Sequence, residues 1–373
     1  MKIKLLLALS MCNCAALVAS AADAPAAKPM APAAADSGPY HLIKEIHIGG
    51  SPRTDYLTVD PDGHRLYVSH SDSVAVIDLD KGEVVGNITG NLAGVHGIAI
   101  ASKLGLGFIS NGTGNNVSIF DLKTLKVTKT VDTGRNPDWI MFEPGQKEVY
   151  AFNGGSNSVT VFDAVAGTVT ATIALPGKPE SATYDVAAGR VYDNIEDKAE
   201  VVAIDTKTHA VVATWPNAPA VGASGQAIDT EHHLLVLGCD DTMGLMDIAS
   251  GKVVSTLKAA PGIDSAAFDP ATGYAFVPAG GPGGSANGAV TIAKVVNGKL
   301  TLVQSLSTPA GAKTMALDPT THNIYTATVK YDAAAPAPAA ASGSGTGRGG
   351  RAPRPAAVAD SFRVLVYGMD AKK

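Results

Sequence analysis

A unit of about 42 residues repeats along the chain, and this period constrains the fold more than any other feature of the sequence. Its clearest copy, residues 137–177, contains four short extended runs that end at Pro144, Asn153, Asp163 and Gly177. The aspartate that closes the third run recurs at steps of 43, 42, 42 and 42 residues, as Asp78, Asp121, Asp163, Asp205 and Asp247. Four short strands at a period of 40–45 residues are typical of β-propeller blades.

Counting the strands of each unit predicts how many blades there are and how the ring closes. Seven segments match a first strand, and they begin at Tyr56, Gly97, Trp139, Ser181, Gly225, Ser265 and Thr314. Fourth strands also number seven only if the N-terminal stretch His41–Gly49 is included. We therefore predict an all-β fold, a seven-bladed β-propeller of four-stranded antiparallel blades. The N-terminal strand should pair with residues 362–367 of the last blade, because ring closure removes exposed strand edges.

The recurring aspartate has a structural explanation. Glycine follows it four residues later in several units, as in Asp78 and Gly82 or Asp163 and Gly167. A carboxylate at the start of a turn accepts backbone N–H groups, and glycine adopts the left-handed conformation at its end. We therefore expect this column to form turns and not to catalyse a reaction.

The N-terminus has the pattern of an export signal. Lys2 and Lys4 precede an apolar stretch, and small residues around Ala21 and Ala22 offer a cleavage site. We predict a signal peptide over residues 1–22, an Ala/Pro-rich tether over 23–39 and the propeller over 40–373, which places the protein in the periplasm or outside the cell. The mature chain then keeps one thiol, Cys239, and forms no internal disulfide.

Charge and hydropathy restrict the partners. The 34 acidic residues outnumber the 29 basic ones, which gives a net charge of −5, so no global basic field attracts nucleic acid. No apolar run reaches the ~18 residues of a membrane span. We expect a monomer that binds a small molecule or a protein partner of unknown identity.

Two insertions lengthen the connections between second and third strands. Residues 279–289 extend blade six, and the Ala/Pro/Gly/Ser-rich residues 331–360 extend blade seven. The second insertion is interpreted as a low-complexity loop. The alternative is a basic arm that contacts an acidic partner through Arg348, Arg351 and Arg354.

One polar position recurs just before or at the start of each first strand. First strands are innermost in a propeller, so these seven residues should surround one mouth of the central channel, and we call them the mouth column: Asp55, His96, Asp138, Glu180, Ser224, Asp264 and Lys313. Neighbouring carboxylates would raise one another's pKa and favour a bound cation. The plain alternative is that each residue only caps the backbone. Further candidates for the ligand site lie a few residues before or after a mouth-column residue in their own blade: Arg53, Arg135, Lys178 and Trp139.

The other polar residues do not indicate a specific catalytic or metal site. The sequence has no spacing typical of a metal site or of a nucleophile with its base, so no residue is assigned as catalytic and no cofactor is expected, although the mouth column could hold a divalent metal ion. Asp193, Glu196 and Asp197 are predicted to form a solvated acidic loop on the mouth side.

The repeat resembles that of the YVTN-repeat propellers, the YncE-like family. The matching positions include Gly134, Pro137, Tyr150, Asn153 and, in the third strand, Val159, Val161 and Asp163. The resemblance implies an exported seven-bladed ring that serves as a binding platform, and one family member is associated with single-stranded DNA. The wider fold includes lactonases, and a fold alone does not choose among such functions.

The sequence therefore favours an exported binding or scaffold protein that uses the mouth face. Two alternatives are a lactonase-like or other metal-assisted hydrolytic propeller enzyme and a single-stranded nucleic-acid binder.

Overall fold

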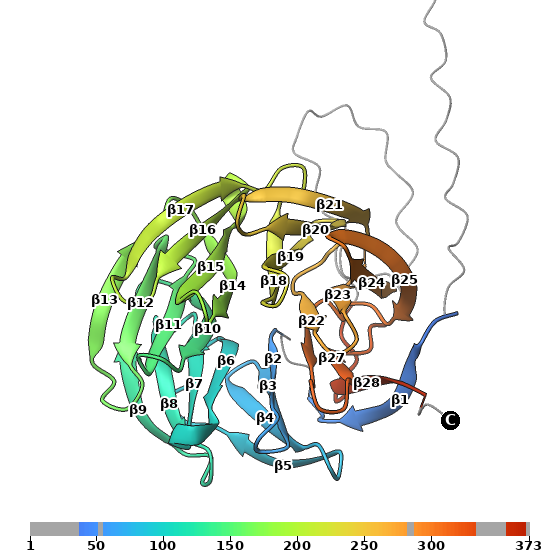
Figure 1. The fold of residues 1–373 in the computed structure, drawn as a ribbon. Coiled ribbons are helices and arrows are strands. Elements are labelled where there is room, and N and C mark those ends of the chain that lie inside the picture. The colour runs from blue at the N-terminus through green and yellow to red at the C-terminus, as the bar shows by residue number, and fades with distance from the viewer. Residues whose placement is uncertain (1–36, 51–54, 282–286, 333–355, 371–373) are drawn as a thin grey trace, which may run out of the picture. The chain divides into compact units, whose positions relative to one another are not determined.

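The structure is a computed structural model that describes residues 37–50, 55–281, 287–332 and 356–370. Within these ranges, seven four-stranded antiparallel sheets form the blades of a ring (Figure 1). The only helical elements in the described part are two short 3-10 turns, η1 (Ser102–Leu104) and η2 (Glu196–Lys198). The prediction of a seven-bladed β-propeller is confirmed.

The strands follow one another from the hub to the rim in every blade. Blade one contains β2 (Leu57–Asp60), β3 (Arg65–His70), β4 (Ser73–Asp78) and β5 (Glu83–Ile88); blade two contains β6 (Val95–Ala101), β7 (Leu106–Asn111), β8 (Asn116–Asp121) and β9 (Val127–Asp132). Blade three contains β10 (Pro137–Glu143), β11 (Glu148–Asn153), β12 (Ser158–Asp163) and β13 (Val169–Ala174); blade four contains β14 (Pro179–Asp185), β15 (Arg190–Ile195), β16 (Glu200–Asp205) and β17 (Ala210–Pro216).

The remaining blades have the same order. Blade five contains β18 (Ala223–Asp229), β19 (Leu234–Cys239), β20 (Thr242–Asp247) and β21 (Lys252–Lys258); blade six contains β22 (Ala267–Asp269), β23 (Tyr274–Ala279), β24 (Gly288–Val296) and β25 (Lys299–Thr308). Blade seven contains β26 (Met315–Leu317), β27 (Ile324–Thr328), β28 (Arg363–Met369) and, as its outer strand, β1 (Tyr40–His47).

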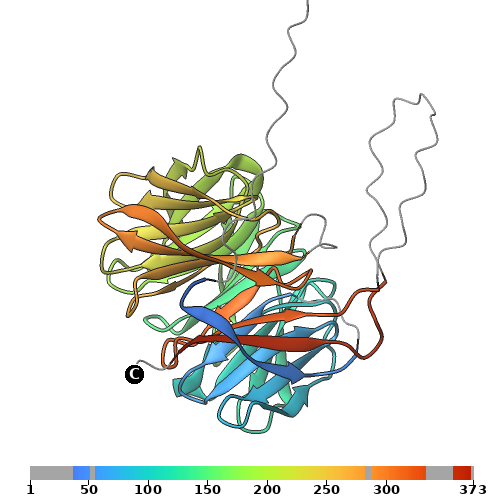
Figure 2. The ribbon, with the colours of Figure 1, turned by 90° about the vertical axis from the view of Figure 1, so that its right-hand side faces the viewer.

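The two ends of the described chain close the ring in blade seven. β1 pairs antiparallel with β28, from Tyr40 opposite Met369 to His47 opposite Arg363, and both views show them side by side (Figures 1 and 2). The Tyr40 side chain is fully buried and packs edge-on against Phe276 of blade six. The predicted closure is therefore confirmed, and β1 also joins blade seven to blade six.

The recurring aspartates form the predicted turns. Asp163 Oδ1 accepts the backbone N–H groups of Val165 and Ala166 at 2.9 and 2.6 Å. Gly167 then adopts a φ of 69° and donates its N–H to the Asp163 carbonyl. In blade four, hydrogen bonds from the Thr208 and Lys207 backbone lower the pKa of Asp205 to about 2. These half-buried carboxylates stabilise turns between the third and fourth strands.

Apolar side chains fill the spaces between neighbouring blades. One cluster, for example, contains Phe108 and Val117 of blade two together with Val149 and Phe162 of blade three. Because each sheet is covered on both faces by its neighbours, the second and third strands are almost entirely buried. This packing fixes the inner first strands, which lie around the centre of the ring in Figure 1.

Both predicted insertions occur between a second and a third strand. In blade six the insertion separates β23 from β24, and in blade seven it separates β27 from β28. The ends of the blade-seven insertion are held together, since Asp332 donates to the Ala356 carbonyl and Val358 to the Lys330 carbonyl. The predicted signal peptide, all but the last three residues of the tether, and the three arginines of the proposed basic arm lie outside the described residues. No helix in the described ranges is long and apolar enough to cross a membrane.

Candidate binding site at the channel mouth

The first strands bring most of the mouth column together at one end of the ring. His96, Asp138 and Glu180 lie in β6, β10 and β14, while Asp55 and Lys313 lie two residues before β2 and β26. The connections that enter the first strands pair with the connections between second and third strands, as where Gly154 donates to the Asn136 carbonyl. Each blade therefore presents its mouth residue on the same face of the ring.

Three residues from adjacent blades form the centre of the site, and we call them the hub triad: Asp55, His96 and Asp138. His96 Nδ1 lies 2.5 Å from Asp55 Oδ2 and 3.5 Å from Asp138 Oδ1. One potential ligand atom from each residue lies within 4.8 Å of the others. The three side chains are 17–18% exposed, so they are shielded by protein yet reachable from the mouth.

Backbone contacts hold the hub triad in place. The Asp55 N–H donates to Ser69 Oγ at 3.0 Å, and its carbonyl accepts from Thr314 Oγ1 at 2.6 Å. Ser110 Oγ donates to the Asp138 carbonyl at 2.5 Å. Gly112 lies against the imidazole, because a Cβ at that position would be 2.5 Å from His96 Nε2. Ser69 and Gly112 belong to the same blade as the residue that they support, whereas Thr314 and Ser110 belong to the neighbouring blade, so packing within and between blades determines the geometry.

Burial shifts the titration of Asp138. Desolvation, followed by the negative charge of Asp55, raises the pKa of Asp138 to about 6, and the positive charge of His96 opposes this shift. Among the described residues, no donor makes a hydrogen bond to the buried Asp138 Oδ1. This carboxylate is therefore held in a site where a positive charge would be favourable.

Two lysines pair with the other mouth carboxylates. Lys178 forms ion pairs with Glu180 and, at 2.8 Å, with Glu196. Burial and the charge of Asp138 raise the pKa of Glu180 to about 8, and Lys178 opposes the shift. On the other side of the hub, Lys313 forms an ion pair with Asp264. Burial raises the pKa of Asp264, and Lys313 opposes that shift as well.

The remaining predicted site residues lie outside this network. Ser224 Oγ donates to the Ile263 carbonyl at 2.9 Å, so its hydroxyl supports the backbone. The Arg135 side chain is exposed, and Arg53 lies outside the described residues. Trp139, a predicted ligand-site residue, packs against the cluster between blades three and four, and its ring meets that of Tyr56 edge-on at 4.9 Å.

Tyr56 is a hub residue that the sequence reasoning missed. Its side chain is 4% exposed, and burial followed by the charges of Asp138, Asp264, Asp55 and Glu180 raises its pKa. Tyr56 therefore lies near carboxylates from four different blades. A signal was present in the sequence, because Tyr56 and Trp139 are the two aromatic residues in a column of otherwise small ones: Gly97, Ser181, Gly225, Ser265 and Thr314.

Asp193 contradicts the prediction of a solvated acidic loop. It lies within β15 and is 0% exposed, and neither carboxylate oxygen has a hydrogen-bond partner in the described part of the chain. Its strand neighbours are Ala182 and Val202. Burial and then the charge of Glu180 raise its pKa well above the usual range, and the nearby Glu180 backbone N–H, which lies outside hydrogen-bond geometry, opposes the shift. The sequence prediction was wrong because the strand continues two residues past Asp193.

The charge balance of the hub favours a cation. Glu180 and Asp264 are each paired with a lysine, whereas Asp55 and Asp138 share one imidazole. Among the described residues, one imidazole is thus the only ion-pair partner of the two carboxylates in the hub triad. A buried carboxylate that lacks a positive partner is costly, so a positively charged ligand would stabilise this arrangement.

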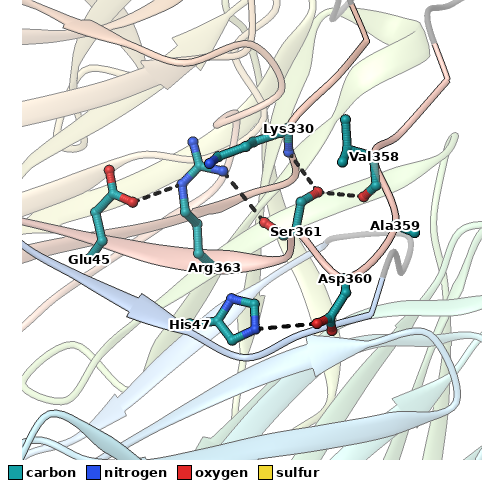
Figure 3. Close-up of a pocket in the computed structure, with 8 residues that line it drawn as sticks. All are labelled: Glu45, His47, Lys330, Val358, Ala359, Asp360, Ser361 and Arg363. Carbon is teal, nitrogen blue, oxygen red and sulfur yellow. Dashed lines mark hydrogen bonds and ion pairs between the residues drawn. The ribbon is translucent and has the colours of Figure 1, made fainter.

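A cavity of about 320 Å³ lies where the ring closes (Figure 3). Four of its charged or ionisable groups form pairs, since Arg363 Nε lies 3.2 Å from Glu45 Oε2 and His47 Nε2 lies 3.8 Å from Asp360 Oδ2. Ser361 Oγ accepts the Lys330 N–H at 3.0 Å. These contacts connect β1 to the end of the blade-seven insertion, so we assign them to ring closure.

Comparisons with known proteins identify the fold and no family. No protein-family profile matches the chain, and no curated protein sequence matches it. A hydrazine synthase chain of Kuenenia stuttgartiensis is similar with a TM-score of 0.63 and 17% identity, covering 77% of this chain and 96% of its own. U3-55K is similar with a TM-score of 0.67 and 13% identity, covering 88% and 98%. At these identities the similarity supports the β-propeller fold alone.

Proposed function

We propose that this protein is an exported, periplasmic β-propeller that binds a positively charged ligand, or a positively charged group of a partner, at the channel mouth. We further propose that it is related to the YVTN-repeat, YncE-like propellers, whose repeat its sequence resembles. The export signal and the repeat support these two points, and the hub supports the sign of the ligand.

The observation that carries the proposal is that carboxylates of two blades meet at one imidazole, since Asp55 Oδ2 and Asp138 Oδ1 lie 2.5 and 3.5 Å from His96 Nδ1. Burial, followed by the charges of Asp138, Asp264, Asp55 and Glu180 from blades three, six, one and four, raises the pKa of Tyr56. Residues that only capped their own strands would point into separate surroundings, as Ser224 does. Ionised carboxylates that lie close together repel one another, and a bound cation reduces this repulsion.

Equilibrium dialysis with two cobalt complexes tests the sign of the ligand. Hexaamminecobalt(III) and hexacyanocobaltate(III) are both inert octahedral complexes, but the first is a trivalent cation and the second a trivalent anion. We expect the full chain, at low ionic strength, to retain the cation and not the anion. The double variant Asp138→Asn, Glu180→Gln should retain less cation, whereas Asp62→Asn, an exposed acid in the turn between β2 and β3, should behave as wild type. Preferential retention of the anion, or equal cation retention by the double variant, would overturn the proposal.

A metal-assisted hydrolase is the second candidate. The observation in its favour is the raised pKa of Asp138, about 6, beside His96, because a carboxylate with such a pKa can transfer protons near neutral pH. Hydrolysis of a simple lactone that disappears in Asp138→Asn would favour this candidate over a binding protein. The acidic hub and the negative net charge do not favour single-stranded nucleic acid as the ligand.

A further inference from the structure

We propose that the hub triad of Asp55, His96 and Asp138 is a binding site for one divalent transition-metal ion, with Zn²⁺ and Mn²⁺ as the best-suited ions. This inference rests on the proposed function, because it names the cation that the channel mouth binds. It adds the coordinating atoms, the stoichiometry and the chemical class of the ligand.

The spacing of the donor atoms is close to what a metal ion needs. Bonds of about 2.1 Å place neighbouring ligand atoms about 3.0 Å apart in an octahedral site and about 3.4 Å apart in a tetrahedral one. His96 Nδ1 lies 2.5 Å from Asp55 Oδ2 and 3.5 Å from Asp138 Oδ1, so the two separations bracket these values. A small rotation of the Asp55 carboxylate away from the imidazole makes room for the ion.

A second observation also points to a cation. The Asp138 Oδ1 atom is buried, faces the His96 ring nitrogen and accepts no hydrogen bond within the described chain. A buried acceptor without a donor is unfavourable, and most such atoms in proteins are satisfied by a donor, a water or an ion. Coordination to a metal ion would satisfy this oxygen.

The charge of the site matches a divalent ion. Lys313 forms an ion pair with Asp264, and Lys178 forms ion pairs with both Glu180 and Glu196, so both lysines are engaged with acids other than Asp55 and Asp138. Asp55 and Asp138 together carry two negative charges when ionised. His96 binds a metal ion through Nδ1 only when that nitrogen carries no proton, so the imidazole is then neutral. A divalent ion neutralises the hub triad, whereas a monovalent or trivalent ion would leave the triad with a net charge.

The donor types select the class of metal. Imidazole nitrogen suits Zn²⁺ and other first-row transition ions, while carboxylate oxygen also suits Mn²⁺, Mg²⁺ and Ca²⁺. A site with one nitrogen and two carboxylates therefore favours Zn²⁺ and Mn²⁺ over Mg²⁺ and Ca²⁺. The outer contacts are those of a supported site, because Ser69, Thr314 and Ser110 hold the backbone of the two acids and Gly112 lies against the imidazole.

Isothermal titration of chelator-treated full-length protein with Zn²⁺, and separately with Mn²⁺, tests the inference. We expect one ion per chain, and an affinity for Zn²⁺ at least ~100-fold weaker in His96→Asn and in Asp138→Asn, because loss of a ligand should exceed the ~10–100-fold effect of outer contacts. Asp62→Asn should bind as wild type. Mg²⁺ and Ca²⁺ should bind more weakly than either transition ion.

A spectroscopic measurement covers the case in which these variants do not fold. Electron spin-echo modulation of Mn²⁺ bound to the wild-type chain should show one directly coordinated imidazole nitrogen. Absence of that nitrogen signal, or unchanged Zn²⁺ affinity in folded His96→Asn and Asp138→Asn, would overturn the inference. If hexaamminecobalt(III) is retained but neither Zn²⁺ nor Mn²⁺ binds stoichiometrically, the metal site is wrong and the proposed cation-binding function stands.

Discussion

Replacing Asp193 should stabilise the protein, because this buried carboxyl has no hydrogen-bond partner in the described structure. At the equivalent position five of the other six blades have an apolar residue and blade seven has the buried Thr326, so an apolar residue fits this position: Val68, Ile109, Ala151, Leu237 and Val277. A buried polar group without a partner costs about 1–3 kcal/mol even when uncharged. We therefore expect Asp193→Val to increase the free energy of unfolding by at least that amount at pH 5.

The stabilisation should also grow with pH. The folded state raises the pKa of Asp193, so between the ordinary aspartate pKa and the raised one the folded chain holds a proton that the unfolded chain has released. The free energy of unfolding of the wild type then falls as pH rises through this window, by up to about 1.4 kcal/mol per pH unit from this group. Asp193→Val has no such group, so its advantage should be larger at pH 7 than at pH 5.

Urea unfolding followed by tryptophan fluorescence measures both effects. Asp193→Asn removes the charge but keeps a buried polar group, so it should reproduce the change in pH dependence with less stabilisation than Asp193→Val. Asp62→Asn is the control for loss of an exposed acid and should stay close to wild type. A wild type that is more stable than Asp193→Val at pH 7, or a difference between them that does not change from pH 5 to pH 7, would refute the reasoning.

Three further predictions concern the site, the ring and export. Gly112→Ala should weaken Zn²⁺ binding by more than about tenfold in a calorimetric titration, because the added Cβ would displace His96; an unchanged affinity would contradict the assigned role of Gly112. Deleting residues 40–48 should expose the β28 edge and produce aggregates in analytical ultracentrifugation, whereas a stable soluble monomer would argue against closure by β1. Mass spectrometry of the protein from the periplasm should give an N-terminus just after Ala21 or Ala22, and an intact Met1 would contradict export by cleavage.

The fold was predictable because each blade repeats the same local chemistry. The column from Asp78 to Asp247 fixes the turns between third and fourth strands, and a fixed period of turns fixes the strands between them. The lone strand at residues 41–49 could be assigned to blade seven because a ring of repeats must cover its edges. Such arguments need no knowledge of which side chains meet across the ring.

The site was only partly predictable, because the repeat specifies strands and turns but not the contacts between blades. The mouth column follows from the repeat, but the repeat does not say that Asp55 and Asp138 share His96 while Ser224 turns to a backbone carbonyl. Those outcomes depend on contacts between blades, which the period leaves undetermined. Asp193 was misassigned because a charged residue near the end of a strand is usually solvated, and the sequence alone did not place it between Ala182 and Val202.

The most direct test of a cation site at the hub is an anomalous-diffraction measurement on crystals of the full chain soaked in Mn²⁺. Our account predicts one strong peak bonded to His96 Nδ1 and to a carboxylate oxygen of both Asp55 and Asp138. Peaks only at surface histidines, with none between these three side chains, would contradict it.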